Sequence, residues 1–348
     1  MNPKIKNTLK YVLSFVIAGV LLYFSFRSVD WHEFLACLKA CQWEYVALTM
    51  FCCAGVQLFR GLRYKMLINP IDPSVPFSAS FNSVNIGMLA NIALPRAGEL
   101  IRCGYVTRHS ARGEDGKKKA SYDKVIGTVV VERAWDILFG AILIILVLFL
   151  CKDEIGDYFR NNLLGGIKQK SGAMWIGIAV VLLIVVLAWA IRHFRDRNSL
   201  FKKIDDVFQG IGTGLTTCLH MEKGWLFVLY TVAIWILYWG QSWFILMAMK
   251  RIDPSALGTD LSGPLAILES LGPEDALFLM LAGSASSLIP APGGFGAYHG
   301  VVAGVLSGVY AIPFHLGLLY ATLAHESVTL TQALMGLGSF IHESIKKE

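Results

Sequence analysis

The sequence predicts an all-α polytopic membrane protein, with about six spanning helices and two further apolar regions that Pro and Gly residues break into hairpins. The first observation is composition: 55% of the 348 residues are hydrophobic and only 16% are charged, against about 25% in typical soluble domains. The second is that the charged residues gather in short stretches between long apolar runs, as expected when those runs lie in lipid. We therefore treat residues 1–348 as a single integral membrane domain.

Several apolar runs are long enough to cross a bilayer, because a spanning helix needs about 20 mostly apolar residues. They cover residues 9–26, 45–66, 124–150, 172–191, 225–249 and 313–341. The first run follows a basic stretch, as in a signal peptide, but no small-x-small cleavage site follows it, so we expect it to be retained as a helix. Residues 200–220 are expected to form a helix on the cytoplasmic surface.

Basic loops orient these helices by the positive-inside rule. Lysines near both ends of the chain place the N- and C-termini in the cytoplasm, and we expect the inner (cytoplasmic) membrane of a bacterium. Both flanks of residues 77–106 are basic, so we expect a re-entrant hairpin that turns near Pro95 and leaves on the face it entered. Irregular backbone at membrane depth is tolerated only where protein or a watery cavity covers it.

Residues 275–311 form the second broken region. This region is either a hairpin that enters from the outer face or two short crossings, and the loop charges are compatible with both. Two hairpins from opposite faces would match the paired interruptions of inverted-repeat transporters, whose binding sites lie at such breaks. The two regions share little sequence identity, so the inverted repeat stays an open alternative.

Charged residues surround the first break, in the stretch Asn91–Arg102. Pro lacks a backbone N–H and Gly tolerates unusual backbone angles, so the helix breaks here, beside Arg96, Glu99 and Arg102. A guanidinium offers a planar fork of donors that suits phosphate, so we predict that these three residues bind substrate. The alternative is that they are interfacial residues whose long side chains reach water and anchor a loop.

Three ionisable residues interrupt the apolar run 124–150: Glu132, Arg133 and Asp136. Glu132 and Asp136 lie four positions apart and share a helix face, and Arg133 lies three before Asp136. Charges at this depth are costly, usually face the bundle interior and usually pair. We predict a substrate or coupling role, or a structural ion-pair cluster that ties this helix to residues 77–106; the two interpretations are compatible.

The second break, Ser287–His299, is rich in glycine. Its loop can form a phosphate-cradling nest at the start of a helix, but no Gly-Lys-Ser/Thr follows, so it is not a nucleotide loop. The alternative is a tight turn between helices. The predicted binding residues are Pro290, Pro292, Gly293, Gly294 and Gly296, together with His299 and, in the last apolar run, His325. Such histidines, and the adjacent Glu326, are either hydrogen-bonded packing residues or ligands or proton carriers.

Several function classes are disfavoured. The net charge of +6 comes from Lys and Arg that flank apolar segments, so we expect no nucleic-acid partner. The seven cysteines are odd in number and show no Cys/His metal spacing, so we expect neither a disulfide framework nor a metal. No catalytic motif is visible and no loop is long enough to fold into a catalytic domain, so we expect no enzyme, no catalytic residues and no cofactor.

The three motifs resemble those of a known family. The stretches Asn91–Arg102, Glu132–Asp136 and Pro290–Gly296 are similar, in order and spacing, to the N-x-x-L-P-x-R-x-G-E-x-x-R, E-R-x-x-D and P-x-P-G-G-x-G stretches of the lysylphosphatidylglycerol synthase transmembrane-region (flippase-like) family. This family is related to the membrane part of the bacterial multiple peptide resistance factor. The resemblance spans nearly the whole chain. Relatives often carry Glu where this chain has His299 and Arg where it has His325, which implies a changed lipid preference or coupling step.

The resemblance implies a lipid flippase or lipid-transport protein, whose cargo is an anionic or modified phospholipid or a polyprenyl-phosphate-linked lipid. In this hypothesis Arg96 and Arg102 engage the phosphate, Glu132 and Asp136 balance their charge, and the 290–296 turn closes the opposite side. No counterpart of the aminoacyltransferase domain of some relatives is present, so no synthase activity is implied. Two alternatives stay open: a non-catalytic accessory subunit that presents lipid to a glycosyl- or aminoacyl-transferase partner, and a transporter of small solutes or ions.

Overall fold

The computed structural model describes residues 15–16, 18–27, 29–94, 97–114, 116–151, 193, 218, 221–252 and 262–345 of the chain. They belong to two compact units: unit 1 comprises Met1–Val129 and Leu226–Glu348, and unit 2 comprises Val130–Trp225. The expected span 172–191 lies outside the described residues, as does the expected surface helix 200–220 apart from Cys218.

The described residues are helical and contain no strand. In chain order the helices are α2 (Trp31–Ala40), α3 (Trp43–Ile68), α4 (Phe77–Ala93), α5 (Ala97–His109), α6 (Tyr122–Leu150), α10 (Gly224–Lys250), α11 (Ser262–Ser270), α12 (Pro273–Ala285), η3 (Ser286–Leu288), η4 (Pro292–Gly294), α13 (Ala297–Tyr310) and α14 (Phe314–Ile345). Helices α3, α6 and α10 are long and apolar enough to cross a membrane. They contain the expected spans 45–66, 124–150 and 225–249, so the all-α membrane fold is confirmed. Helix α14 has 32 residues and is therefore ~48 Å long, although polar residues interrupt its apolar sequence.

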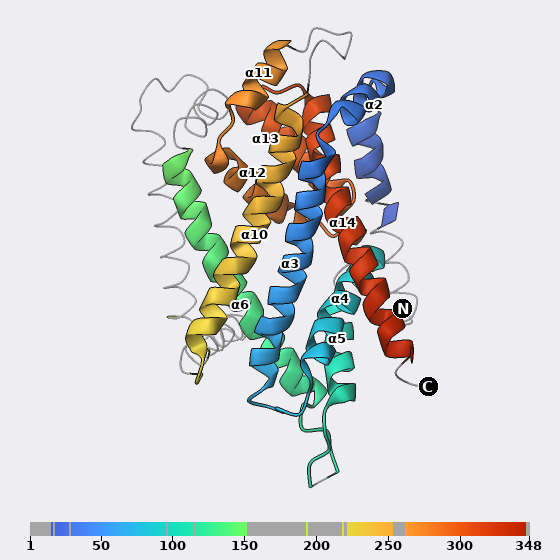
Figure 1. The fold of residues 1–348 in the computed structure, drawn as a ribbon, viewed down its shortest axis with the longest axis vertical. Helices are drawn as coiled ribbons and strands as arrows, with labels where there is room; N and C mark the ends of the chain where they lie inside the picture. Colours follow the sequence, from blue (N-terminus) through green and yellow to red (C-terminus); the bar gives the residue numbers. More distant parts are fainter. Residues whose placement is uncertain are drawn as a thin grey trace. The chain divides into compact units, whose positions relative to one another are not determined.

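Helices α4 and α5 pack against each other as an antiparallel pair, which we call hairpin 1 (residues 72–111) (Figure 1). Helix α4 ends at Ala93, with Leu94 as its C-cap. The Asn91 side chain accepts a hydrogen bond from the Gly98 N–H at 2.8 Å, so it caps the start of α5. The two arms touch closely, because a Cβ at Gly98 would overlap the carbonyl oxygen of Gly87. That the hairpin enters and leaves the bilayer on its cytoplasmic face stays a prediction.

A buried aspartate closes the base of hairpin 1. Asp72, before α4, accepts hydrogen bonds from the Ser110 hydroxyl (2.6 Å) and the Ala111 N–H (2.8 Å), which follow α5. Burial by itself raises the pKa of this carboxyl, but the hydrogen bonds from these groups and from Ser74 outweigh it and lower the pKa to about 2, because they stabilise the charged form. The two ends of the hairpin are thereby held together.

Helices α12 and α13, with η3 and η4 between them, form hairpin 2 (residues 272–310). Asp275, at the start of α12, accepts a hydrogen bond from the Tyr310 hydroxyl at the end of α13 (2.7 Å). The helices have 13 and 14 residues, so each is only ~20 Å long and too short for a hydrocarbon core of about 30 Å. These lengths favour a hairpin over two crossings for residues 275–311.

The two hairpins lie at opposite ends of α3 within unit 1 (Figure 1). Ile68, at the C-terminal end of α3, shares a core cluster with Val75 and Val106 of hairpin 1. Val46, near the other end, belongs to a second cluster that contains Leu279 of hairpin 2. Helix α3 has 26 residues, or ~39 Å, so the hairpins approach the bundle from opposite sides. This is the arrangement that an inverted repeat would give; a repeat origin stays a prediction.

Helix α14 contacts both hairpins. Its first half packs in the cluster around hairpin 2, and its second half packs against α4 of hairpin 1. Gly336 allows the close approach to α4, because a Cβ there would lie 2.6 Å from the Cβ of Leu89. Farther along, His342 Nδ1 lies 3.1 Å from the Asn82 amide nitrogen. Helix α14 therefore packs against hairpin 2 with its first half and against hairpin 1 with its second half.

Candidate functional site

The tips of the two hairpins meet inside unit 1. Gly293, in the tip of hairpin 2, lies against hairpin 1, because a Cβ at this position would be 3.3 Å from the carbonyl oxygen of Ile92. Gly293, Gly294 and Gly296 have φ angles of 58°, 82° and 76°, which residues with a side chain rarely adopt. The glycines of this break are therefore required both by the backbone shape and by the close approach of another segment.

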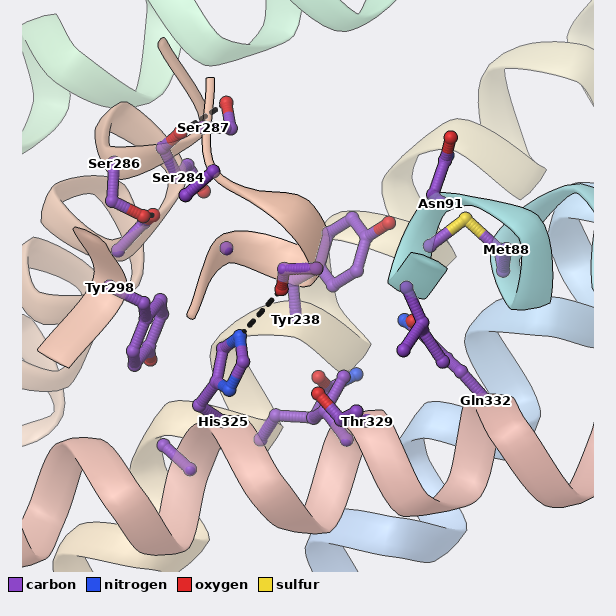
Figure 2. A pocket seen from close by; sticks show the side chains of 18 of the residues that line it. Met88, Asn91, Tyr238, Ser284, Ser286, Ser287, Tyr298, His325, Thr329 and Gln332 are labelled. Atoms are coloured by element: carbon purple, nitrogen blue, oxygen red, sulfur yellow. Dashed lines mark hydrogen bonds between the residues drawn. The ribbon is translucent and has the colours of Figure 1, made fainter. Parts of the chain in front are cut away.

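A cavity of about 380 Å³ lies where the tips meet, and α10 and α14 complete its walls. Figure 2 shows the polar side chains around it. These are Asn91, Tyr238, Gln241, Ser242, Ser284, Ser286, Ser287, Tyr298, His325, Thr329 and Gln332. No Lys, Arg, Asp or Glu among the described residues lines it. Hydroxyl and amide groups can donate and accept hydrogen bonds, but most of the lining surface is apolar, so the cavity suits a group with both polar and apolar parts.

The cavity brings together only some of the predicted site residues. Its lining includes four of them: Pro290, Gly293, Gly294 and His325. Pro292, Gly296 and His299 lie in the same hairpin but not in the lining. Gly296 instead faces the helical segment 18–26, where a Cβ would lie 2.7 Å from the backbone nitrogen of Leu22. A substrate role for each of these residues stays a prediction.

The charged residues of the first motif lie elsewhere. Arg96 is outside the described residues, and Glu99 and Arg102 are on α5 and do not line the cavity. Arg102 is buried at 3% exposure, and its guanidinium carbon lies 4.5 Å from the centre of the Tyr64 ring. This is a cation–π contact, so part of the role of Arg102 is to join α5 to α3.

The charged residues of the second motif lie on the part of α6 that belongs to unit 2. Arg133 and Asp136 form an ion pair with a nitrogen–oxygen distance of 3.7 Å, as their spacing predicted. Glu132 is buried at 1% exposure. The pairing of Glu132 or Asp136 with an arginine of hairpin 1 stays a prediction.

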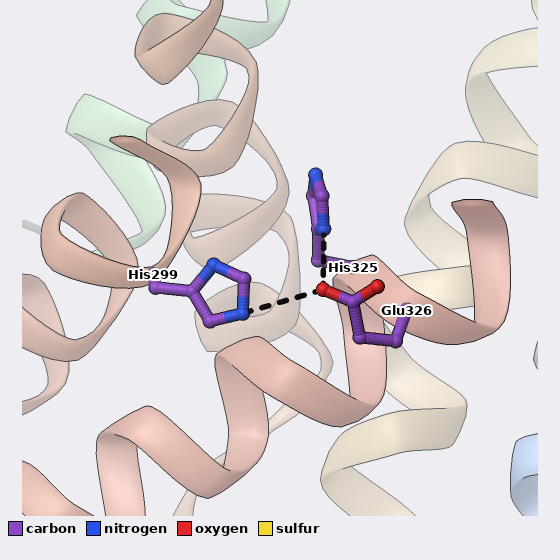
Figure 3. A group of neighbouring side chains, drawn as sticks. All are labelled: His299, His325 and Glu326. Atoms are coloured by element: carbon purple, nitrogen blue, oxygen red, sulfur yellow. Dashed lines mark hydrogen bonds and ion pairs between the residues drawn. The ribbon is translucent and has the colours of Figure 1, made fainter. Parts of the chain in front are cut away.

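Two histidines join the tip of hairpin 2 to α14 (Figure 3). The Nε2 atom of His325 lies 2.8 Å from the carbonyl oxygen of Gly293, and its Nδ1 atom lies 3.0 Å from Oε1 of Glu326. His299 of α13 is 2% exposed, and its Nε2 atom lies 3.6 Å from the same carboxylate oxygen. The two histidines are far apart in sequence, and the packing of α13 on α14 brings them together.

Arg60 of α3 is a buried cation beside the cavity that the sequence did not reveal. Its residue is 7% exposed, and its Nη1 atom lies 3.2 Å from the sulfur of Met88, which lines the cavity. Among the described residues, no carboxylate lies within 4.0 Å of the guanidinium. The available signal was an Arg inside the apolar run 45–66. The positive-inside rule uses such a residue only to orient the end of a helix and does not indicate that it is buried.

Two buried carboxamides extend this polar region along the interface of α3 and α4. Gln57 lies one turn before Arg60, and Asn85 lies one turn before Met88. Both residues are fully buried, and their side-chain amide atoms have no hydrogen-bond partner among the described residues. Leaving such a group unsatisfied costs roughly 1–3 kcal/mol, so exceptions of this kind point to a site that water or a ligand occupies.

Residues 11–336 match the sequence model of the family described as Lysylphosphatidylglycerol synthase TM region, so the chain belongs to that family. The resemblance carried by the three motifs is thereby confirmed. Comparisons with curated proteins and with solved structures gave no match. The family and the apolar helices together identify a multi-pass membrane protein related to lipid metabolism or transport.

Proposed function

We propose that this member of the lysylphosphatidylglycerol synthase transmembrane-region family is a lipid flippase of the bacterial cytoplasmic membrane, with both termini in the cytoplasm. Its cargo is an anionic or modified phospholipid or a polyprenyl-phosphate-linked lipid. One observation carries the proposal: two broken hairpins approach from opposite ends of α3, and their tips meet at a cavity that has polar side chains in its lining. Inverted-repeat transporters bind substrate at such breaks near the bilayer midplane.

The cavity lining supports a polar head group as the part of the cargo that is bound. The lining consists of hydroxyls, amides and one imidazole beside apolar surface, and these groups hydrogen-bond the hydroxyls of glycerol or a sugar. A volume of about 380 Å³ lies within the usual range of small-molecule sites. The acyl or prenyl chain would lie outside this cavity.

A second, apolar groove offers a place for the acyl or prenyl chain of the cargo. This groove also has a volume of about 380 Å³, and it is lined by side chains of α2, α3 and α14 such as Leu38, Val46, Met50 and Leu330. Glu326 is the one charged residue that lines it among those described. Because His325 lines the polar cavity and Glu326 lines the apolar groove, neighbouring residues of α14 face the two spaces.

The phosphate of the cargo needs a cation, and Arg60 is the best placed of the described residues. Its guanidinium contacts Met88, whose flexible side chain also lines the cavity. A buried guanidinium without a carboxylate partner is costly in a membrane, and a phosphate would offset that cost through charge-assisted hydrogen bonds. Arg96 and Arg102 stay in the proposal as further phosphate ligands, with Glu132 and Asp136 balancing their charge.

Reconstitution into proteoliposomes tests the proposal. The assay measures flipping of fluorescent phosphatidylglycerol, of a polyprenyl-phosphate-linked sugar and of a glycosyl-diacylglycerol, which lacks phosphate. We expect the wild type to flip at least one phosphate-bearing lipid faster than protein-free vesicles do. Arg60→Gln should slow this flipping about tenfold, which corresponds to ~1.4 kcal/mol, whereas flipping of the phosphate-free lipid should not depend on Arg60.

The matched control is Arg251→Gln. Arg251 lies at the end of α10, where its guanidinium contacts the Tyr45 ring at 5.5 Å, away from the cavity lining. Removing this charge should leave flipping within about twofold of the wild type, since it lies outside the proposed site.

Wild-type vesicles that flip none of the lipids would contradict the flippase. If such vesicles instead activate an added transferase, the protein is an accessory subunit; if they take up water-soluble tracers, it is a solute carrier.

A further inference from the structure

Three ionisable side chains form a cluster behind the tip of hairpin 2, next to the proposed lipid site (Figure 3). His299 comes from α13, and His325 and Glu326 come from α14. The side chains of His299 and His325 are only 2% and 10% exposed, and that of Glu326 is 43% exposed. None of the roles assigned to the lipid site explains why a carboxylate and two imidazoles meet here.

The hydrogen-bond partners determine which nitrogen of His325 carries a hydrogen. The carbonyl oxygen of Gly293 can only accept, so the Nε2 atom, 2.8 Å away, must donate to it. A neutral imidazole has one N–H, so the Nδ1 atom would then present a lone pair. This atom lies 3.0 Å from Oε1 of Glu326, and the oxygen of an ionised carboxylate is also only an acceptor.

Two acceptor atoms at this distance repel each other unless a cation lies between them. A second proton on the imidazole converts the contact into a charge-assisted N–H···O hydrogen bond, and 3.0 Å is an ordinary length for such a bond. We propose that His325 and Glu326 bind one exchangeable proton at this contact, so that the cluster is a proton-binding site within the membrane domain.

His299 gives the proton a second acceptor. Its Nε2 atom lies 3.6 Å from the same Oε1 atom, and its buried Nδ1 atom has no hydrogen-bond partner among the residues that the structure describes. In the transfer, the N–H bond at Nδ1 of His325 breaks as an O–H bond forms on Glu326. That O–H bond then breaks as an N–H bond forms at Nε2 of His299. The positive charge moves from one imidazole to the other, and nothing else is gained or lost.

Few other titratable groups of the described residues face the cluster. The rings of Phe26 and Tyr298 pack against the two imidazoles, and Tyr238 adds a hydroxyl from the cavity side. On the groove side, the described lining contains no titratable group beyond Glu326 itself. No Lys or Arg of the described residues lies within 4.0 Å of Glu326. Without the proton the cluster therefore carries one uncompensated negative charge, which is costly in a membrane, and with the proton it is neutral.

A divalent metal ion is the rival occupant, because one donor atom from each side chain lies within 4.8 Å of the others. The distances favour the proton. Two ligands on tetrahedral zinc, each about 2.0–2.1 Å from the ion, lie about 3.3–3.4 Å apart, whereas His325 and Glu326 approach to 3.0 Å. A zinc ion would also leave a net positive charge on the cluster, which the proton does not.

Proton binding acts on the tip of hairpin 2 because the His325 imidazole contacts both Glu326 and the carbonyl oxygen of Gly293. When the proton leaves, Nδ1 of His325 and Glu326 repel each other, the ring turns, and its hydrogen bond to Gly293 is weakened. Gly293 lines the cavity, so the protonation state changes how firmly the tip is held there. The coupling to lipid movement rests on the proposed function, whereas the proton site itself does not.

The test is nitrogen NMR of the full-length protein in nanodiscs at neutral pH, with nitrogen-labelled histidines and a His325→Gln variant to assign the resonance. In the wild type both ring nitrogens of His325 should carry hydrogen, and in the Glu326→Gln variant, whose amide can donate to Nδ1, the Nδ1 hydrogen should be lost. His342, near Asn82, is the internal reference and should not change. An Nδ1 hydrogen that is absent from the wild type, or that persists in Glu326→Gln, would overturn the proton site.

Further arms separate the remaining outcomes. If Glu326→Gln does not fold, His299→Gln replaces it: the Nδ1 hydrogen of His325 should persist without the second acceptor, and its loss would overturn the proton site at this contact. If chelation changes the histidine resonances and one equivalent of zinc restores them, the occupant is a metal and the proposal is wrong. In proteoliposomes, flipping that responds to a pH gradient in the wild type but not in Glu326→Gln supports the coupling. Flipping that ignores the gradient overturns the coupling alone, and no flipping at all overturns only the proposed function.

Discussion

Hairpins 1 and 2 are built alike at their bases and differently at their tips. A buried aspartate closes each base, Asp72 in hairpin 1 and Asp275 in hairpin 2. Only residues 94–96 separate α4 from α5 in hairpin 1, whereas the connection in hairpin 2 is residues 286–296, with three glycines of positive φ. The bases are therefore structural in both hairpins, and the longer tip of hairpin 2 provides more of the cavity lining.

The difference shows which tip can respond to ligands. Next to the tip of hairpin 1, the Asn91 cap and the contact between Gly87 and Gly98 join α4 to α5. The tip of hairpin 2 has backbone hydrogen bonds of its own, such as the one from the Gly294 N–H to the Ala291 carbonyl oxygen (3.1 Å), and is also held by the hydrogen bond from His325 on α14 to Gly293. A contact with another helix can be made and broken without unfolding the hairpin, so hairpin 2 is the part whose position a proton or a lipid can change.

The largest effect is expected at the contact between the arms of hairpin 1. A methyl group at Gly98 would overlap the backbone of Gly87, so Gly98→Ala must separate the arms. We expect a loss of roughly 3 kcal/mol or more in stability, at the upper end of overpacking effects. The control is Gly104→Ala in the same helix, where a Cβ has space and the better helix propensity should stabilise slightly. Equal thermal unfolding of the two variants would show that the arms are not rigidly packed.

The second prediction compares the two bases. The pKa of Asp72 is about 2, below the ordinary value of about 3.9, so the folded protein binds this proton less readily than the unfolded chain. The resulting stabilisation is present above about pH 4 and is lost as the pH falls toward 2, and it amounts to ~2–3 kcal/mol. Asp72→Asn should therefore unfold more easily than the wild type at pH 7, and the difference should shrink near pH 2.

The control for this prediction is the exposed Glu222. Glu222→Gln should leave the unfolding temperature nearly unchanged, since the side chain is solvated in both states. Asp275→Asn, which removes the corresponding carboxylate of hairpin 2, should destabilise in the same direction as Asp72→Asn. If only one of the two base variants is destabilised, the hairpins are not equivalent at their bases.

The sequence predicted the membrane helices and the breaks because lipid imposes simple rules on them. A long apolar run must become a helix, and Pro and Gly must interrupt it. For the same reason the glycines at 293, 294 and 296 could be singled out before their φ angles were known. The end of α4 at Leu94 also follows from the adjacent Pro95.

The composition of the cavity could not be predicted, because its residues are unremarkable one at a time. Asn91, Tyr238 and Ser284 come from three different segments, and only the packing of the hairpins brings them to one space. Arg60 lies near the end of the apolar run 45–66, where charge counting cannot distinguish a buried cation from a cytoplasmic flank. The contact of His299 with Glu326 likewise depends on tertiary packing that no sequence spacing encodes.

The third prediction tests the tip of hairpin 2. Gly293→Ala must adopt a φ near 58°, which costs ~1–2 kcal/mol for a residue with a side chain, and its methyl group would meet the Phe295 ring at 2.8 Å. We expect slower flipping and a loosened tip, with the helices still folded. Gly304→Ala in α13 is the control, because a Cβ there meets nothing within 4 Å. Equal flipping rates for the two variants would mean that the tip is not part of the pathway.

The smallest effect is expected at Arg96, beside the break of hairpin 1. If its guanidinium holds a phosphate through two hydrogen bonds, Lys cannot reproduce that geometry. Arg96→Lys would then lose about one hydrogen bond, or ~1 kcal/mol, which slows flipping roughly fivefold without changing thermal stability. The measurement is the initial flipping rate of a phosphate-bearing lipid, with Arg108→Lys at the exposed end of α5 as the control.

The alternative for Arg96 predicts a different result from the same experiment. An interfacial anchor needs only a long cationic side chain, and Lys and Arg both reach the membrane surface. Unchanged flipping by Arg96→Lys would therefore remove the tip of hairpin 1 from phosphate binding and leave Arg60 as the candidate cation. Hairpin 1 would then be a scaffold and hairpin 2 the responsive element. A fivefold loss would instead add a phosphate ligand from hairpin 1, so that the cargo contacts both hairpins.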